Sequence, residues 1–150
     1  MREILFRGKR VDSGEWVQGC LVFIEASNVK TTDGKINKSV CCITKPYFPF
    51  EITVNDADNL DLALYRIIPE TVGQYTGLTD KNGKKIFEGD IVDILTENGE
   101  IGVIAYNDGG FLVEADTFCV TFQDNINGTD VEIIGNIHDN PELLEESNNA

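Results

Sequence analysis

The stretch IPETVGQYTGLTDKNGKKIFEGDIV at residues 68–92 carries the main fold signal of this 150-residue chain. Asn82-Gly83 lies between apolar residues and is the pair most typical of a two-residue β-hairpin turn. Glu88-Gly89-Asp90 predicts a turn that enters a buried strand, because glycine supplies the bend and an apolar pair follows at 91–92. The stretch therefore predicts antiparallel β-structure rather than helix.

Turn signals continue toward the C-terminus at Asn98-Gly99, Gly109-Gly110 and Asn127-Gly128. The intervening segments are predicted strands, at residues 85–87, 91–95, 101–106, 111–115 and 131–137. Five short strands at this spacing are typical of a closed SH3-like barrel, and closure also removes exposed strand edges. We expect the barrel over residues 71–140, followed at 141–150 by a short helix that begins at Pro141 and a frayed tail.

Residues 1–70 are predicted to form a separate β-rich subdomain. Segments 3–8 and 15–24 flank Asp12-Ser13-Gly14 and predict a first hairpin. A second reversal is expected at Asp33-Gly34, before a strand over 38–44 that ends ahead of Pro46. The other segments in this part of the chain are a connection at 47–50, a loop or short helical turn at 55–61, and 62–68, which fits helix or strand equally well. The expected fold class is mainly β.

Charge is distributed unevenly along the chain. In total there are 26 acidic and 12 basic residues, a formal net charge of −14. Residues 1–85 hold 11 acidic and 12 basic residues, whereas residues 86–150 hold 15 acidic residues and no lysine or arginine. A field of this sign repels nucleic-acid backbones. It therefore favours either plain solubility or attraction to a basic partner.

The sequence carries no targeting or membrane signal. No apolar run approaches the ~18–20 residues that a membrane helix needs. The opening MREILFRGK interrupts its apolar stretch with charge too early for a signal peptide. We therefore expect a cytoplasmic protein with no membrane partner.

The four cysteines are Cys20, Cys41, Cys42 and Cys119. Their spacing matches neither a disulfide framework nor a metal site. Apolar neighbours surround Cys20 and Cys119, which predicts that both are small buried side chains rather than reactive groups.

One group of candidate binding residues lies within the deciding stretch: Gln74, Tyr75, Thr76 and Asp80. Polar and aromatic groups on a loop carried by a rigid barrel are a common recognition device, so these residues could face a ligand. The alternative is structural: they cap turns and fill the seam between the two halves.

A second group lies on the predicted first hairpin, where Arg7 and other basic residues cluster near Trp16. Cations beside a stacking ring suit single-stranded nucleic acid. Acidic residues at positions 3, 12 and 15 dilute this patch, and the attached half carries a charge of −15. Nucleic acid is therefore the less favoured partner.

Catalytic and metal-binding patterns are weak. The only histidine, His138, lies beside a helix start and far from any serine elbow or cysteine. The carboxylates are spread too evenly to single out a glycosidase pair. Residues 56–61, DADNLD, lack the glycine and glutamate of a calcium loop, and no glycine-rich phosphate loop occurs. We expect no enzymatic activity, no metal and no cofactor.

The block at 68–92 closely resembles the YopX family of phage and prophage proteins. Three more segments resemble the same family in the same order: MREILFRGK at 1–9, GEWV at 14–17 and IGNIHDNPELL at 134–144. The resemblance is nearly end to end and weakest over 25–65. It implies an SH3-like barrel in the second half, a phage or prophage genome and the cytoplasm of a host cell, with no known reaction. His138 departs from the aromatic residue often found in the closing motif.

These observations predict a phage accessory protein that acts as a non-enzymatic protein-interaction module. Its partner would be a host or phage protein, and strand edges in the first half also allow a homo-oligomer. The alternative is a protein directed at nucleic acid, either by direct binding through the basic hairpin or through an acidic surface that mimics DNA.

Overall fold

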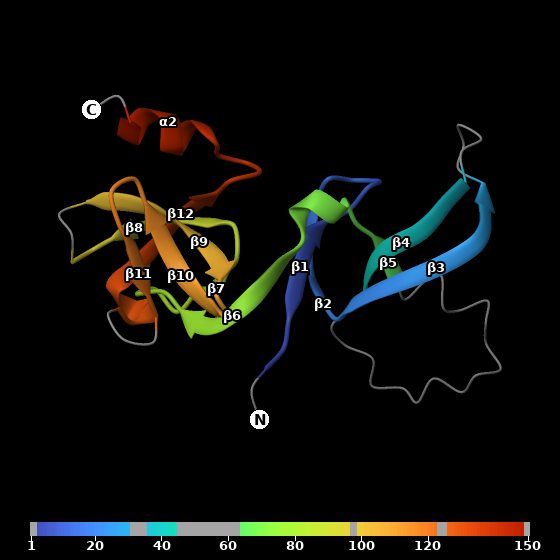
Figure 1. The fold of residues 1–150 in the computed structure, drawn as a ribbon, viewed down its shortest axis with the longest axis horizontal. Coiled ribbons are helices and arrows are strands. Elements are labelled where there is room, and N and C mark those ends of the chain that lie inside the picture. Colours follow the sequence, from blue (N-terminus) through green and yellow to red (C-terminus); the bar gives the residue numbers. More distant parts are fainter. Residues whose placement is uncertain (1–2, 31–35, 45–63, 97–98, 123–125, 149–150) are drawn as a thin grey trace. The chain divides into compact units, whose positions relative to one another are not determined.

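The computed structural model describes residues 3–30, 36–44, 64–96, 99–122 and 126–148 (Figure 1). The chain divides into two compact units. The N-terminal unit comprises residues 4–72, and the C-terminal unit comprises residues 1–3 together with 73–150. The domain limits expected from the sequence, at 70 and 140, stay a prediction.

The N-terminal unit begins with an antiparallel hairpin of β1 (Phe6–Lys9) and β2 (Trp16–Gly19). Gly14 adopts a φ of 71° in the connecting turn, a conformation that glycine reaches at low cost. The amide of Arg10 donates to the carbonyl of Glu15 at 2.9 Å and closes the turn. The predicted first hairpin is therefore confirmed.

A three-stranded antiparallel sheet completes this unit, in the order β3 (Leu21–Lys30), β4 (Ile36–Thr44) and β5 (Leu64–Arg66). The strand predicted at 38–44 is confirmed, and the segment at 62–68 that fitted helix or strand contains a strand. The expectations at 33–34, 47–50 and 55–61 lie outside the described residues. Ile43 and Ile67 form the buried centre, against which Phe6, Val17 and Leu21 pack.

The C-terminal unit is built mainly on a five-stranded antiparallel sheet in the order β11-β10-β9-β8-β12 (Figure 1). Its strands are β8 (Asp90–Ile94), β9 (Glu100–Asn107), β10 (Gly110–Ala115), β11 (Cys119–Thr121) and β12 (Val131–Asn136). Before them, β6 (Gly73–Thr79) and β7 (Lys85–Phe87) form an antiparallel hairpin. Short 3-10 helices lie at Pro69–Thr71, in the N-terminal unit, and at Gly128–Asp130, and α2 spans Glu142–Asn148.

The mainly β fold class is confirmed, as are the five strands predicted in this unit and the helix after Pro141. Two strands, β6 and β11, were not predicted. Within the described part of the chain, β11 and β12 are the edges of an open order, and no pairing between them closes the sheet, so the closed barrel expected over residues 71–140 is not found there. The 3-10 turn at Gly128–Asp130 lies between β11 and β12 in the chain.

The core of the C-terminal unit is aliphatic. Its buried members are Ile86, Val92, Ile94, Ile104, Val113, Ile126 and Val131. They come from five strands and the segment before the second 3-10 helix, so the core depends on pairings distant in sequence. Complete burial of one such side chain stabilises a fold by about 1.5–3 kcal/mol.

The cysteine prediction was wrong for both residues that can be checked. Cys20 and Cys119 are exposed. Cys119 lies on the short edge strand β11, opposite Glu114, which is also exposed, so both side chains belong to the outer face of the sheet. Cys20 follows the buried Gly19 between two strands. Apolar neighbours in the sequence did not indicate burial, because alternate strand positions face opposite sides.

Gly102 allows two strands of the C-terminal sheet to approach closely. A Cβ placed there would collide with Cγ1 of Val113 and lie 3.0 Å from the carbonyl oxygen of Glu114. Gly110, in the same hairpin, has no atom within 4 Å of an added Cβ. A methyl group is therefore expected to destabilise the fold at Gly102 but not at Gly110.

We expect Gly102→Ala to lower the free energy of unfolding by about 1–3 kcal/mol, the usual cost of overpacking a filled core. The matched control Gly110→Ala is expected to leave it unchanged or slightly raised, since the unfolded chain loses freedom at no steric cost. Urea unfolding followed by circular dichroism measures both. Equal stabilities of the two variants would contradict the close approach at Gly102.

Candidate functional site

A hollow of about 400 Å³ lies on the C-terminal unit. Three elements form its walls: strand β6, the β9–β10 hairpin and the residue that follows β11. Its lining residues are Gln74, Thr76, Leu78, Tyr106, Gly109, Gly110, Phe111 and Phe122. We call this hollow the aromatic groove.

The β9–β10 hairpin sets the aromatic wall of the groove. Tyr106 and Phe111 are directly opposed across the two strands, and their rings meet edge to face with centroids 5.0 Å apart. The two residues of the turn, Asp108 and Gly109, have φ values of 50° and 81°. Two positive φ angles define the tight turn that matches strand twist, so the rings lie on a well-determined hairpin. Tyr106 is nevertheless 53% exposed.

Strand β6 supplies the opposite wall through Gln74 and Thr76. The loop expected for these residues is wrong, because residues 73–79 form a strand. Gly77, with a φ of 88°, lies in an irregularity of the pairing between β6 and β7, where glycine allows the bulge. The hydroxyl of Thr76 donates to the carbonyl of Ile86 at 2.9 Å.

Tyr75 and Asp80, the other two residues of the predicted group, do not line the groove. Tyr75 is buried and packs against Phe87 at a centroid distance of 5.6 Å. Strand alternation explains the split, since Gln74 and Thr76 face one side and Tyr75 the other. Half of the group thus lies together in the groove, and a binding role for any of the four stays a prediction.

Asp80 is a buried acceptor for three backbone amides. Its Oδ1 accepts from the amides of Asn82 and Lys84, both at 2.9 Å, and its Oδ2 accepts from Ile133 at 3.0 Å. The first two bonds close the β6–β7 turn, and the third ties that turn to β12. Asp80 therefore caps a turn, which is the structural role that the sequence analysis gave as the alternative to ligand binding.

The hydrogen bonds also set the charge state of Asp80. Burial by itself would raise the pKa of this carboxyl, but the amides of Ile133, Lys84 and Asn82 together lower it below its ordinary value. Asp80 is only 2% exposed, so water contributes little to holding the charge. The ionised carboxylate is therefore part of the native fold.

In the N-terminal unit, the structure brings the predicted pair Arg7 and Trp16 together. The guanidinium carbon of Arg7 lies 4.8 Å from the ring centroid of Trp16, and Nζ of Lys9 lies 5.6 Å from it. Likewise, Arg10 lies over Tyr65 at 4.4 Å. The basic hairpin is thus a cluster of cation–π contacts within the chain.

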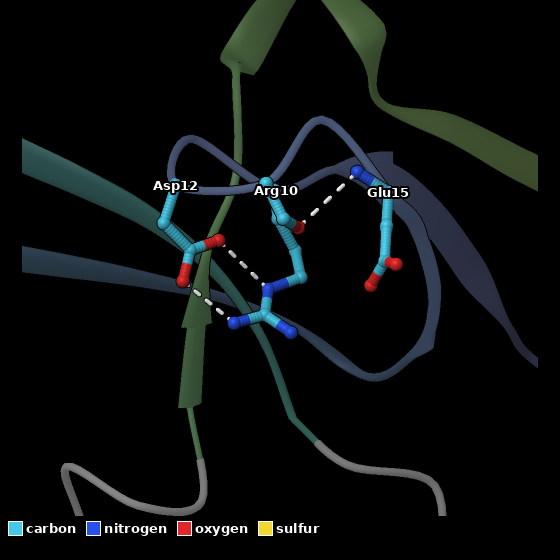
Figure 2. A network of polar contacts seen from close by, with 4 residues as sticks. Arg10, Asp12 and Glu15 are labelled. Atoms are coloured by element: carbon cyan, nitrogen blue, oxygen red, sulfur yellow. Dashed lines mark hydrogen bonds and ion pairs between the residues drawn. The ribbon is translucent and has the colours of Figure 1, made fainter.

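Arg10 also forms an ion pair with Asp12 (Figure 2). Nε of Arg10 is 2.9 Å from Oδ1 of Asp12, and its second terminal nitrogen is 2.6 Å from Oδ2. The side-chain hydrogen bond from Arg10 lowers the pKa of Asp12. Since both groups are solvated, this pair neutralises part of the basic patch and adds little to stability.

The two units differ in charge. The C-terminal unit holds 17 acidic and 4 basic residues, a net charge of −13, and the N-terminal unit holds 9 acidic and 8 basic residues, a net charge of −1. Lys81 is paired with Glu132 at 2.7 Å and Lys85 with Glu3 at 2.9 Å. The unit that bears the aromatic groove therefore carries nearly all of the negative charge.

The family model described as YopX protein matches residues 5–145. The chain belongs to the YopX family. The resemblance seen in the sequence is thereby confirmed. Comparison with curated proteins gives no match for this YopX-family protein.

A solved structure is similar to this YopX-family protein. It is the crystal structure of protein EF1440 from Enterococcus faecalis, with 28% sequence identity and a TM-score of 0.49. The similarity covers 96% of this chain and 99% of that chain.

Three further observations concern the histidine, possible metal sites and membrane helices. The amide of His138 donates to Oδ1 of Asn136 at 3.0 Å in the turn that follows β12. Across the described ranges, no three histidine, cysteine or acidic side chains are grouped so that they could hold a metal ion. No helix in those ranges combines the length and the apolar character needed to cross a membrane.

Sequence reasoning missed the aromatic side of the groove: Tyr106, Phe111 and Phe122. A signal was present for the first two, because one aromatic residue stands on each side of the Asn-Asp-Gly-Gly turn at 107–110. Residues at these positions oppose each other across a tight hairpin. Nothing in the sequence near Phe122 indicates that it lies beside them.

We expect Asp80→Asn to lower the free energy of unfolding by about 2–4 kcal/mol, because buried amides lose a charged acceptor and one faces an NH₂ group instead. Asp108→Asn is the matched control. This residue is exposed with a φ of 50°, a conformation that asparagine tolerates, so its stability should equal that of the wild type. Urea unfolding at neutral pH tests both. An unchanged free energy of unfolding in Asp80→Asn would contradict the role of Asp80 in holding the three backbone amides.

The contribution of Asp80 to stability should also depend on pH. Its folded-state pKa lies below the unfolded value of about 3.9, so the unfolded chain takes up the proton first. Stabilisation is therefore present above about pH 5 and is lost as the pH falls through the folded value. The stability difference between wild type and Asp80→Asn should shrink over this range. The lowered pKa of Asp12 affects both proteins equally and cancels, so a difference that is constant with pH would refute the assignment.

Proposed function

We propose that this YopX-family protein is a non-enzymatic protein-interaction module and that the aromatic groove is its docking site. The observation that carries the proposal is Tyr106, a large aromatic side chain that is 53% exposed in a hollow on a rigid hairpin. Exposed tyrosines in concave sites are typical anchors of protein interfaces. Tyrosine suits this role because it has a wide apolar ring, few rotatable bonds and a polar end.

The composition of the groove supports docking more than catalysis. Its lining combines the apolar side chains of Leu78, Phe111 and Phe122 with Tyr106, Gln74, Thr76 and two glycines, and polar atoms make up the larger part of its exposed surface. The hydroxyl of Thr76 already bonds to a backbone carbonyl, so it is a poor nucleophile. Protein interfaces commonly combine aromatic anchors with polar surroundings of this kind.

The finer fold expectation is part of the same proposal. The first strand of the meander, β8, pairs with both β9 and the last strand β12, as in an open form of the predicted SH3-like barrel. Small barrels of this kind serve many unrelated functions, so function is argued from the groove. With the family membership, we propose a phage or prophage accessory role in the host cytoplasm. The partner would be a host or phage protein, or a second copy of this chain.

The nucleic-acid alternative has one observation in its favour, the cations grouped around Trp16. Two features weigh against it. A base that stacked on Trp16 would compete with Arg7 and Lys9 for the ring, and Asp12 neutralises Arg10. The N-terminal unit also carries no net positive charge to attract phosphate. Acidic mimicry of DNA would use the C-terminal surface and a DNA-binding partner.

Affinity capture with the tagged full chain from a host-cell lysate tests the proposal. We expect a stoichiometric protein partner that resists nuclease and is reduced at least about tenfold by Tyr106→Ala, the scale of an interface hot spot. Quantitative mass spectrometry measures the retained protein. Tyr106→Ala should fold normally because the ring is half exposed, and circular dichroism checks this.

Phe23→Ala is the matched control, since Phe23 is 69% exposed and belongs to the other unit. It should retain the partner fully. Partners that disappear on nuclease treatment would favour the nucleic-acid alternative. A partner that binds Tyr106→Ala as well as wild type would refute the groove as the docking site.

A further inference from the structure

We propose that the aromatic groove binds an extended, arginine-bearing segment of a partner protein. The inference rests on the proposed docking function and adds the chemistry of the occupant. Three features carry it: the exposed ring in the groove, the charge of the unit around it and the open space at its glycine wall.

The exposed ring suits a guanidinium group. Tyr106 is held by an edge contact from Phe111 at 5.0 Å, which leaves more than half of its surface accessible. A guanidinium is planar, weakly hydrated and stacks on aromatic faces better than an ammonium does. The chain itself uses this contact elsewhere, with Arg10 over Tyr65 at 4.4 Å.

The surrounding charge favours a cation and disfavours phosphate. The C-terminal unit carries −13, and after residue 85 the sequence has no lysine or arginine to compensate. Two acidic residues are neighbours of lining residues: Asp108 precedes the lining glycines in the turn, and Oε1 of Glu88 lies 3.4 Å from the amide nitrogen of Gln74. A positive segment is therefore drawn to the groove, and a nucleic-acid backbone is repelled.

The glycine wall leaves room for a backbone to approach. A Cβ added at Gly109 or Gly110 would meet no atom within 4 Å. Gly110 has no positive φ, so a larger side chain fits its backbone and would fill the groove from one side. Gly109 in the turn and Gly110 at the start of β10 line the groove together with Tyr106, which favours an extended segment whose arginine reaches the ring.

Titration of the full chain with capped nine-residue peptides tests the inference. In one peptide arginine alternates with serine, and in the two matched peptides lysine or glutamine replaces arginine. Amide chemical shifts of Gly109 and Gly110 report binding at the groove. We expect saturable shifts with the arginine peptide, weaker binding with lysine and none with glutamine. Affinity should fall as salt is raised from about 50 mM to 500 mM, because screening weakens attraction between exposed charges.

Two variants separate groove binding from general attraction to the acidic surface. Tyr106→Leu keeps apolar bulk but removes the ring, and it should weaken binding of the arginine peptide between about threefold and thirtyfold. Gly110→Val should weaken it by filling the groove. Phe23→Leu, in the other unit, should bind as the wild type does.

The inference is overturned if the lysine or glutamine peptide binds as tightly as the arginine peptide, or if Tyr106→Leu binds it unchanged. It is also overturned if no peptide shifts Gly109 and Gly110. The peptide results can be distinguished from failure of the proposed docking function by the capture experiment. Capture of a protein partner that still depends on Tyr106 would keep the groove as a docking site for an occupant of other chemistry, whereas capture independent of Tyr106 would remove both.

Discussion

The C-terminal unit depends on the buried carboxylate of Asp80, which holds together backbone segments far apart in the sequence. Two of its hydrogen bonds close the β6–β7 turn, and the third reaches Ile133 on β12, 53 residues further along. An ionised group in this position is stable only because each oxygen has amide donors. These bonds lie directly after the end of β6, and β6 carries one wall of the aromatic groove.

The second constraint is the close approach of β9 and β10. Gly102 leaves space for Val113, and the tight turn at Asp108 and Gly109 sets the register that opposes Tyr106 and Phe111. The aliphatic core beneath these strands cannot rearrange without losing burial. A half-exposed ring on so constrained a hairpin has little conformational freedom to lose, which would reduce the entropic cost of the proposed docking.

Charge and shape act together in this YopX-family protein. In the N-terminal unit, Arg7, Lys9 and Arg10 contact Trp16, Tyr65 and Asp12, and the unit is nearly neutral. The C-terminal unit leaves both an aromatic ring and an excess of carboxylates toward solvent. The C-terminal unit has an internal contact of the same kind, Lys85 over Tyr75 at 5.1 Å, but Tyr106 is left half exposed, and under the proposed function a partner's cation would stack on it.

The sequence by itself determined the mainly β class, five of the seven strands of the C-terminal unit and the family, because alternation and turn dipeptides such as Asn82-Gly83 act over a few residues. Only the tertiary structure decided that residues 73–79 form a strand, that Cys20 and Cys119 are exposed, and that Gln74, Tyr106 and Phe122 line one groove. Such features depend on strand pairing across tens of residues. Asp80 shows the difference: the sequence left open whether it faces a ligand or caps a turn, and its donor at Ile133 becomes visible only in the folded chain.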